Sequence, residues 1–389
     1  MVTQRAARPA FEVADVFRAH GEAYRQAHSM TGDQVKVMRA IETCRTAVLG
    51  GHVDLCLDCG AMTPSYNSCR NRHCPKCQGL EQAEWIDARK ARTLPVHHFH
   101  VVFTLPAELR AVAKANQEVV YSILFREAAR TLLDLGADRL GAVLGVTEVL
   151  HTWTRALTYH PHVHCIVTGG GLSLDGKRWI STSKKYLFPF KVLSRLFRGK
   201  FLAALRQAHS AGELKGVSAK DFAVLVAQLY RKEWVAYAKK PFGRVEHVFE
   251  YLGRYTHRVG ISNQRLLGLE EHAVRFLTKN GQSVSLPPEE FIRRFLQHVL
   301  PPGFVKIRHY GLLAPANVNT KLQAALRLLS PPELPPLVEP VADAPPPEPQ
   351  TWEERLLALT GIDVRVCRHC GGSRIEHRPL SDFPELDTS

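Results

Sequence analysis

Residues 159–167, with the sequence YHPHVHCIV, carry the strongest chemical signal in the chain. Histidines occupy alternating positions at His160, His162 and His164, and an apolar run follows them. A period of two is typical of a β-strand, in which side chains two positions apart project from one face. His162 and His164 could then coordinate one metal ion. Imidazole binds transition metals and, together with waters, also helps to bind magnesium. The alternative is a histidine-rich strand end whose rings are solvated or hydrogen-bonded.

A second chemical signal lies in residues 251–258, with the sequence YLGRYTHR. Tyr251 and Tyr255 are four positions apart, which on a helix places both phenol groups on one face. The ordinary interpretation of such a pair is an aromatic stripe in a core, but Arg254 and Arg258 are unusual neighbours for a buried stripe. A phenol has a pKa near about 10, so attack on phosphorus needs a nearby cation or metal that favours the phenolate.

Two Cys-x-x-Cys knuckles form the third signal. Fourteen residues separate the first knuckle, Cys56 and Cys59, from the second, Cys74 and Cys77. Each knuckle offers two thiolates from a tight turn, so the spacing predicts one tetrahedral structural zinc site bound by all four sulfurs. Four thiolates leave no open position on the metal, which disfavours a catalytic role for this zinc.

The other cysteines have weaker assignments. Cys69 and His73 lie between the two knuckles as alternative ligands or as neighbours of the ligands, whereas Cys44 is interpreted as a buried thiol. A further knuckle at residues 367–370 supplies half of a zinc site. The sequence leaves open whether His377 or another group completes that site.

The charge distribution indicates a polyanionic partner. The chain has 51 Lys and Arg against 37 Asp and Glu, a formal net charge of +14. Residues 331–389 carry a net charge of −6, so residues 1–330 carry +20. A body this basic favours binding to nucleic acid or an anionic membrane over a merely soluble basic surface. The candidate DNA-contacting cations lie beside the zinc knuckles and the tyrosines: Arg70, Arg72, Lys239, Lys240, Arg254 and Arg258.

The apolar segments and the cysteines indicate in which cellular compartment the protein is found. No uninterrupted apolar run approaches the roughly 20 residues of a membrane span, and residues 1–10 lack the apolar core of a secretory signal. Closely paired cysteines are typical of metal binding in a reducing compartment. We therefore expect a cytoplasmic protein with no membrane partner. The oligomeric state stays open, and a homo-oligomer is compatible with the sequence.

Helices and strands must position these groups. Hydrophobic periodicity predicts helices over residues 11–49, 80–94 and 107–135 and strands over residues 99–105, 144–153 and 160–168. The last two strands are expected to form an antiparallel hairpin. The histidines at the start of the first strand, His97, His98 and His100, are interpreted as a solvated strand end.

The predicted hairpin suggests a third metal ligand. If it is symmetric about residues 157 and 158, His151 lies opposite His164. His151 is then the candidate ligand, with Glu148 as the alternative. A slip of one residue would turn His151 to the other face of the sheet.

Composition divides the chain into four parts. Residues 11–95 form a helical and zinc-binding domain, and residues 96–329 form a domain that carries the histidine and tyrosine motifs. Residues 330–350 are proline-rich and acidic, which is typical of an extended linker. Residues 351–389 form a tail with the single knuckle.

The order of these motifs resembles a known family. The zinc module with its Arg-His-Cys-Pro-x-Cys stretch is followed by Leu-His-Thr-Trp, then His-Pro-His-Val-His, then Tyr-Leu-Gly-Arg-Tyr-Thr-His-Arg. Over about residues 11–330 this order resembles the rolling-circle transposases of the IS91 type. These belong to the wider His-hydrophobic-His (HUH) endonuclease group, which includes replication initiators and relaxases.

The resemblance implies a fold and a set of roles. The expected fold class is α+β, with a ferredoxin-like antiparallel sheet with helices as the HUH-endonuclease core, preceded by a small zinc-ribbon-like domain. His162 and His164 match the metal histidines, and Tyr251 and Tyr255 match the tyrosine pair. The implied cofactors are catalytic Mg²⁺ or Mn²⁺ and structural Zn²⁺. The third metal ligand is not settled by the resemblance.

The implied reaction is strand transfer by a DNA transposase. A tyrosine attacks single-stranded DNA at the transposon ends and target, which leaves a 5′-phosphotyrosine and a free 3′-hydroxyl. The protein would be associated with the nucleoid while bound to DNA. The first alternative is a plasmid replication initiator or relaxase with the same chemistry. The second is a non-catalytic zinc protein that binds DNA. A metal hydrolase is disfavoured, because the chain lacks a series of βα repeats.

Overall fold

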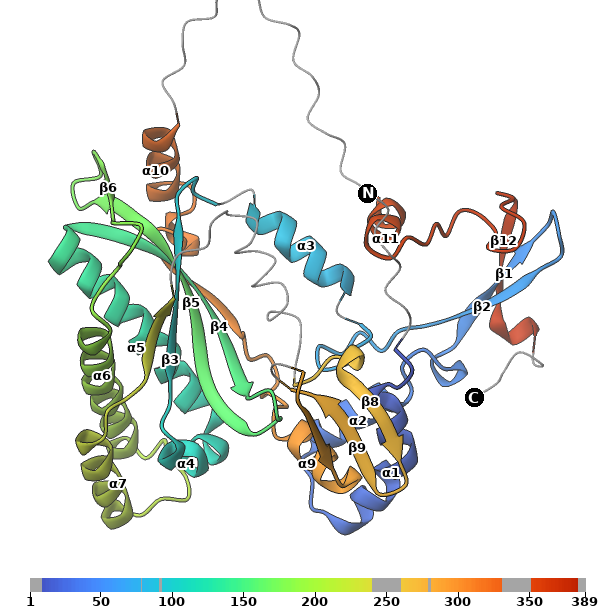
Figure 1. The fold of residues 1–389 in the computed structure, drawn as a ribbon, viewed down its shortest axis with the longest axis horizontal. Coiled ribbons are helices and arrows are strands. Elements are labelled where there is room, and N and C mark those ends of the chain that lie inside the picture. The colour runs from blue at the N-terminus through green and yellow to red at the C-terminus, as the bar shows by residue number, and fades with distance from the viewer. Residues whose placement is uncertain are drawn as a thin grey trace, which may run out of the picture. The chain divides into compact units, whose positions relative to one another are not determined.

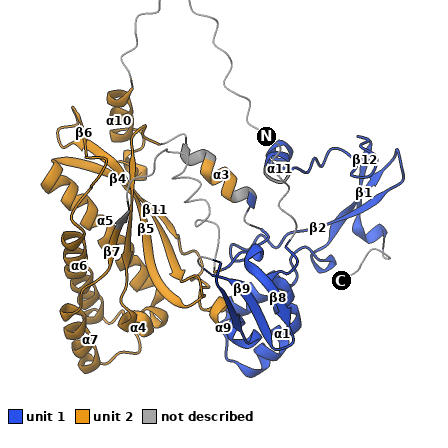
Figure 2. Ribbon diagram, viewed as in Figure 1, with its two compact units in different colours: residues 1–81, 261–293, 333–389 blue, residues 82–260, 294–332 orange. Residues whose placement is uncertain are grey.

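The computed structural model describes residues 9–77, 79–90, 93–239, 260–278, 281–330 and 351–383. The chain divides into two compact units, coloured separately in Figure 2. Unit 1 comprises residues 1–81, 261–293 and 333–389, and unit 2 comprises residues 82–260 and 294–332. Unit 1 thus gathers three stretches that are far apart in the sequence, including residues from the region that we assigned to the tail.

Unit 2 is built on a six-stranded sheet. Its strands are β3 (His98–Thr104), β4 (Ala142–Trp153), β5 (Tyr159–Ser173), β6 (Trp179–Ser181), β7 (Ala236–Lys239) and β11 (Ile307–Gly311). The order is β11-β4-β5-β3-β7, with β6 paired to β5, and all pairs are antiparallel. The histidine-rich strand β5 therefore lies in the interior of the sheet, between β4 and β3.

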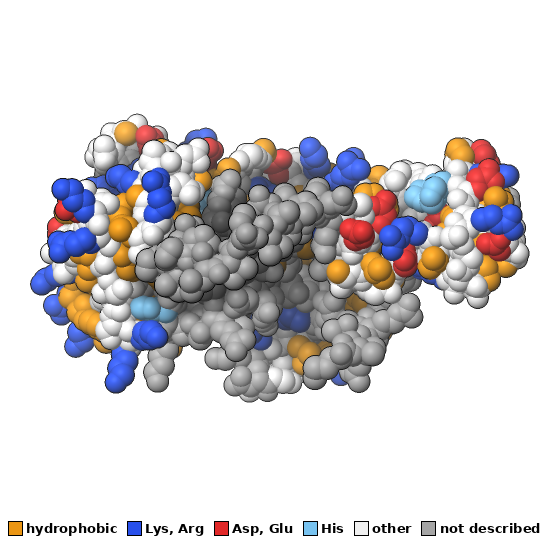
Figure 3. Space-filling view, turned by 90° about the horizontal axis from the view of Figure 1, so that it is seen from above, with side chains coloured by type: hydrophobic (Ala, Val, Ile, Leu, Met, Phe, Trp, Pro, Cys, Tyr) orange, Lys and Arg blue, Asp and Glu red, His pale blue; other side chains and the backbone are white. Residues whose placement is uncertain are grey.

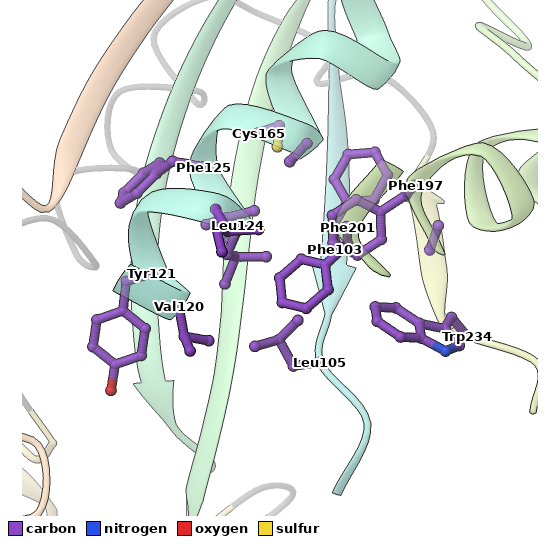
Figure 4. Packing of buried hydrophobic residues seen from close by; sticks show 14 of the residues in the cluster. Phe103, Leu105, Val120, Tyr121, Leu124, Phe125, Cys165, Phe197, Phe201 and Trp234 are labelled. Atoms are coloured by element: carbon purple, nitrogen blue, oxygen red, sulfur yellow. The ribbon is translucent and has the colours of Figure 1, made fainter. Parts of the chain in front are cut away.

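Helices cover one face of this sheet (Figure 1). They are α4 (Arg110–Ala115), α5 (Gln117–Leu135), α6 (Phe190–Ser210) and α7 (Ala219–Arg231). Alternate strand residues such as Phe103 and Val163 pack there against Phe125 and Phe197 in the main hydrophobic core. Figure 4 shows the ring of Phe103 beside Phe197 and Phe201. The strand residues of the other parity, which include the histidines, therefore face away from these helices.

Smaller apolar clusters complete unit 2. Val149 and Ile166 project from the face of the sheet opposite the main core and pack with Trp85 of α3 (Gly79–Lys90) and with Ile307. A second cluster joins Leu172 to α10 (Lys321–Leu329).

Unit 1 contains two helices near its N-terminal end and two small sheets. Helices α1 (Val13–Ala27) and α2 (Gly32–Glu42) both begin with capping boxes, formed by Glu12 with Asp15 and by Thr31 with Gln34. The remaining strands are β1 (Gly51–Cys56), β2 (Met62–Tyr66), β8 (Leu266–Glu270), β9 (Ala273–Leu277), β10 (Ser283–Leu286) and β12 (Ile375–Pro379). Unit 1 also contains α11 (Trp352–Thr360) and the first part of α9 (Pro288–Leu296), whose last residues belong to unit 2. The two sheets have the strand orders β12-β1-β2 and β10-β9-β8.

The α+β fold class with antiparallel sheets is confirmed. The helices and strands predicted around the candidate site are also present, with β4 and β5 as the antiparallel hairpin. Among the described residues, none of the helices combines the length and the apolar character needed to cross a bilayer.

Candidate metal centre and cysteine clusters

Three histidines meet on the face of the unit 2 sheet opposite α4, α5, α6 and α7. His151 comes from β4, and His162 and His164 come from β5. Each offers one ring nitrogen, and the three nitrogens lie within 4.8 Å of one another. Their ring centroids are 4.3 to 5.4 Å apart. The structure thus brings together the three residues that the sequence singled out as metal ligands.

The hydrogen bonds of these rings determine which ring nitrogen carries the lone pair that can bind a metal. The Nδ1 atom of His162 lies 2.7 Å from the carbonyl oxygen of His160, which can only accept, so Nδ1 carries the proton and Nε2 carries the lone pair. Burial lowers the pKa of His162 to about 4. The ring is therefore neutral near pH 7, which is the form that binds metal.

His100 on β3 is the functional neighbour that sequence reasoning missed. Its Nε2 atom lies 2.8 Å from Nδ1 of His164. A metal on Nε2 of His164 requires a proton on Nδ1, and His100 is placed to accept the hydrogen bond from that proton. Metal-bound imidazoles are usually oriented in this way by a second group.

The interpretation of the β3 histidines as a solvated strand end is wrong for two of them. His98 is 5% exposed and His100 is 1% exposed, so both side chains are buried and neither is solvated. The third, His97, lies 3.2 Å from the hydroxyl oxygen of Thr182 through its Nε2 atom. His100 is identified as a neighbour of the metal ligands by its proximity to His164 in the fold. Its spacing in the sequence gives no such signal.

Glu148, the alternative third ligand, points to the other face of the sheet. Its Oε1 atom accepts a hydrogen bond from the Cys165 thiol at 3.4 Å, and the side chain is fully buried on the helix side. Burial raises the pKa of Glu148 well above its usual value. A carboxyl group on the opposite face of the sheet is not positioned to join the three histidines.

The register of the hairpin differs from the prediction by two residues. His151 lies opposite His162, and Val149 lies opposite His164, whereas we expected His151 to face His164. An even shift preserves the side of the sheet, so His151 keeps its predicted face. The hairpin is centred one residue earlier than we assumed, between residues 156 and 157, and its turn contains Leu157 in the left-handed conformation at φ 59°.

The two residues that follow α9, Gln297 and His298, hold that loop. The backbone carbonyl of Leu157 accepts hydrogen bonds from His298 Nε2 at 3.2 Å and from Gln297 Nε2 at 3.3 Å. The other ring nitrogen of His298 lies 3.1 Å from the hydroxyl of Thr152, the residue after His151. His298 therefore ties the hairpin loop to β4, next to the metal ligand His151.

The cysteines form two clusters instead of the one site that we predicted. Cys74 and Cys77 group with Cys44 and Cys69, and all four sulfurs lie within 4.8 Å of one another. The Sγ atom of Cys77 is 3.3 Å from that of Cys44 and 3.6 Å from that of Cys69. Hydrogen bonds from the neighbouring thiols lower the pKa of Cys77, which favours the thiolate that metals require. Cys44 is thus a member of a four-sulfur cluster and not an isolated buried thiol. Cys69 belongs to the same cluster, as expected for the alternative in which it serves as a ligand.

The first knuckle has a different partner. Cys56 and Cys59 group with Cys367 and Cys370 of the C-terminal region. The prediction of a single site made from residues 56, 59, 74 and 77 is therefore wrong. The physical reason is that β1 pairs with β12, which brings the distant knuckle beside Cys56.

The remaining predicted residues are placed as follows. Arg70 is exposed and Arg72 is half-buried, both in the loop before Cys74. Lys239 ends β7, and only its backbone is described. Lys240, Tyr251, Arg254, Tyr255 and Arg258 lie outside the described residues.

Comparisons with known proteins match two parts of the chain to transposase models. Residues 16–105 match the family model described as "Transposase zinc-binding domain", of the IS91 type, and residues 145–321 match the model described as "Putative transposase". The chain is 45% identical to "Putative transposase y4qJ" of Sinorhizobium fredii over 94% of both chains. It is 29% identical to the transposase for insertion sequence element IS801 of Pseudomonas savastanoi pv. phaseolicola, over 77% of this chain and 75% of the relative.

These matches define the protein as a transposase. More narrowly, the chain belongs to the IS91 family of transposases and carries that family's zinc-binding domain. Among solved structures, the conjugative relaxase TRWC in complex with oriT DNA, a copper-bound structure, aligns with a TM-score of 0.22 and 12% identity, over 40% of this chain and 68% of that chain.

Proposed function

We propose that this transposase cleaves and rejoins single-stranded DNA through a covalent tyrosine link during rolling-circle transposition. The observation that supports this most strongly is the meeting of His151, His162 and His164 on one sheet face. Membership in the IS91 transposase family supplies the context of DNA strand transfer.

The three imidazoles fit a divalent metal ion. His162 presents Nε2, because its Nδ1 proton is committed to the His160 carbonyl, and His164 has His100 as a partner for its other nitrogen. Three neutral nitrogen ligands leave further coordination positions for waters or substrate oxygens. Bound there, Mg²⁺ or Mn²⁺ would supply Lewis-acid stabilisation of the charge that develops on the scissile phosphate.

Tyr251 or Tyr255 supplies the nucleophile in this proposal. The phenolic oxygen forms a bond to phosphorus, and the bond from phosphorus to the 3′ oxygen breaks. The products are a 5′-phosphotyrosine ester and a 3′-hydroxyl, which takes up the proton that the phenol gives up. The ester conserves the free energy of the phosphodiester, so rejoining needs no ATP. A second tyrosine permits a second cleavage while the first strand is still attached.

Basic side chains would bind the DNA backbone. Residues 1–330 carry a net charge of +20, and on the face shown in Figure 3 Lys and Arg dominate the charged side chains of unit 2. We propose that Arg70 and Arg72 beside the zinc cluster, and Lys239, Lys240, Arg254 and Arg258 near the tyrosines, contact phosphates of transposon ends and target. On this basis the protein acts in the cytoplasm, at the nucleoid.

A nicking assay tests the proposal. Purified protein is incubated with single-stranded oligonucleotides from the element's ends and with Mg²⁺ or Mn²⁺. We expect cleavage with a covalent adduct on the 5′ side, and mass spectrometry should locate it on Tyr251 or Tyr255. The double variant His162→Ala with His164→Ala should lose nicking and retain DNA binding. Full nicking by that variant would overturn the proposal.

Two further measurements separate the alternatives. The matched control is His272→Ala, which removes an 88% exposed imidazole and should nick like the wild type. A non-catalytic DNA-binding protein would retain its function in cells after Tyr251→Phe with Tyr255→Phe, whereas we expect that variant to be inactive. Transfer of a donor end to a new target in cells distinguishes a transposase from a replication initiator or relaxase.

A further inference from the structure

The knuckles at residues 56–61 and 367–372 have the same backbone turn, although about 300 residues separate them. In the first, Cys56 N donates to Ala61 O at 2.9 Å and Gly60 N donates to Cys56 O at 2.8 Å. In the second, Cys367 N donates to Gly372 O at 2.8 Å and Gly371 N donates to Cys367 O at 2.9 Å.

A glycine in the left-handed conformation follows the second cysteine of each knuckle. These are Gly60, with φ 73°, and Gly371, with φ 76°. A side chain at either position would be strained. The two knuckles therefore have equivalent backbone conformations, and each can present two thiolates to a shared site.

The spacing of the sulfurs fits a tetrahedral metal ion. Cys56 Sγ is 3.6 Å from Cys370 Sγ, and Cys59 Sγ is 3.8 Å from Cys367 Sγ. Zinc–sulfur bonds of about 2.3 Å at tetrahedral angles place neighbouring sulfurs about 3.8 Å apart. Disulfide sulfurs would be about 2.05 Å apart. Backbone amides of His369 and Gly372 also point at Cys367 and Cys370 sulfurs, each at 3.4 Å, as suits thiolate acceptors.

Contacts outside the cluster hold the two segments in register. Strand β12 pairs antiparallel with β1, with Cys56 opposite Ile375. Beyond the strand, Leu57 N donates to Arg374 O at 2.9 Å. The Arg374 side chain donates to the Asp58 carboxylate within the first knuckle at 2.6 Å.

We propose that Cys56, Cys59, Cys367 and Cys370 bind one structural zinc ion, which fastens the C-terminal region to the N-terminal zinc module. The matched zinc-binding model covers residues 16–105, so two of these ligands lie far outside it. Zinc is the expected occupant because a closed tetrahedral set of four thiolates suits it and leaves no position for catalysis. The N-terminal module thus carries one complete cluster of its own and half of a second.

The proposal is tested by zinc content in full-length protein dialysed against EDTA. Cys367→Ser with Cys370→Ser should contain one zinc fewer than the wild type. Cys56→Ser with Cys59→Ser should lose the same single equivalent, and the variant with all four changes should again lose only one, because both pairs act on one ion. Arg378→Ala, a change at an exposed residue of β12 that offers no zinc ligand, should keep the wild-type content. Unchanged zinc after the tail substitutions, additive losses, or iron in place of zinc would overturn the assignment.

A second measurement covers the case in which a variant is poorly folded. A protease site is placed between Pro345 and Pro346 of the otherwise wild-type chain, and the protein is cut after purification with its zinc. The fragment that contains residues 346–389 should co-elute with the rest of the protein in size-exclusion chromatography. Separation of the cut fragment from zinc-loaded protein would contradict the proposal.

Discussion

The Nε2 atom of His100 lies 2.8 Å from the Nδ1 atom of His164, and the two rings stack with their centroids 5.0 Å apart. Neither residue is near the other in sequence, and β3 and β5 bring them together in the sheet. The contact fixes the orientation of a candidate metal ligand and selects which of its nitrogens can bind an ion.

Replacing His100 with Phe should weaken metal binding without removing a ligand. Loss of a hydrogen-bond partner behind a metal-bound imidazole typically costs 10–100-fold in affinity or activity. We therefore expect the Mn²⁺ concentration for half-maximal nicking to rise by about that factor, with activity partly restored at high Mn²⁺. His97→Gln, at a histidine that contacts Thr182, should leave the Mn²⁺ titration unchanged. An unaltered titration for His100→Phe would refute the role.

The buried His298 should make the protein less stable in mild acid. Burial lowers its pKa to about 3, while the unfolded chain has an ordinary histidine pKa near about 6.5. Between these values the unfolded state binds more protons, so the free energy of unfolding falls as the pH decreases, by up to about 1.4 kcal/mol per pH unit. His298→Gln, which retains a donor, should show a shallower dependence in denaturant titrations from pH 7 to pH 5. Equal slopes for the wild type and for His298→Gln would show that His298 does not cause the loss of stability in acid.

Glu148 should have the opposite effect. Its raised pKa means that the folded state keeps a proton that the unfolded chain loses above about pH 4.5, so stability declines as the pH rises above that value. Glu148→Gln preserves the shape of the neutral acid and should flatten that decline. Because the side chain lies on the helix side of the sheet, nicking by Glu148→Gln should match the wild type. Loss of metal-dependent nicking would instead show that Glu148 acts at the metal.

Cys44 should contribute to zinc binding although it belongs to no knuckle. Its sulfur is 3.3 Å from that of Cys77 in the cluster with Cys69 and Cys74. Cys44→Ser should lose about one zinc equivalent after EDTA treatment and should melt at a lower temperature. The comparison is Cys165→Ala, a buried cysteine on β5 whose thiol donates to Glu148, which should retain its zinc. Retention of all zinc by Cys44→Ser would remove Cys44 from the ligand set.

The sequence predicted the histidine site because strand periodicity is a local property. His162 and His164 share a face whatever the rest of the fold does, and His151 joined them because the register differed by two residues and not by one. The position of His100 was unpredictable from spacing, since it depends on the pairing of β3 with β5. The two tyrosines fall outside the described residues, so their role stays a prediction.

The cysteine partners show the same limit. A Cys-x-x-Cys spacing is a local signal for a thiolate-bearing turn, and all three such turns are present in the structure. Which turns share an ion is decided by tertiary pairing, and for Cys56 the partner strand begins at Ile375. Cys44 has no local signal at all, because it reaches its cluster from the turn after α2.

The strand order β12-β1-β2 has a consequence for synthesis of the protein. β1 and β2 leave the ribosome early, yet the strand that pairs with the other edge of β1 is made more than 300 residues later. Any product that stops before residue 367 would expose that edge together with the thiols of Cys56 and Cys59. Such an edge invites pairing with other chains. Truncated copies of the gene should therefore yield aggregation-prone protein that is degraded, rather than shortened competitors for the DNA ends.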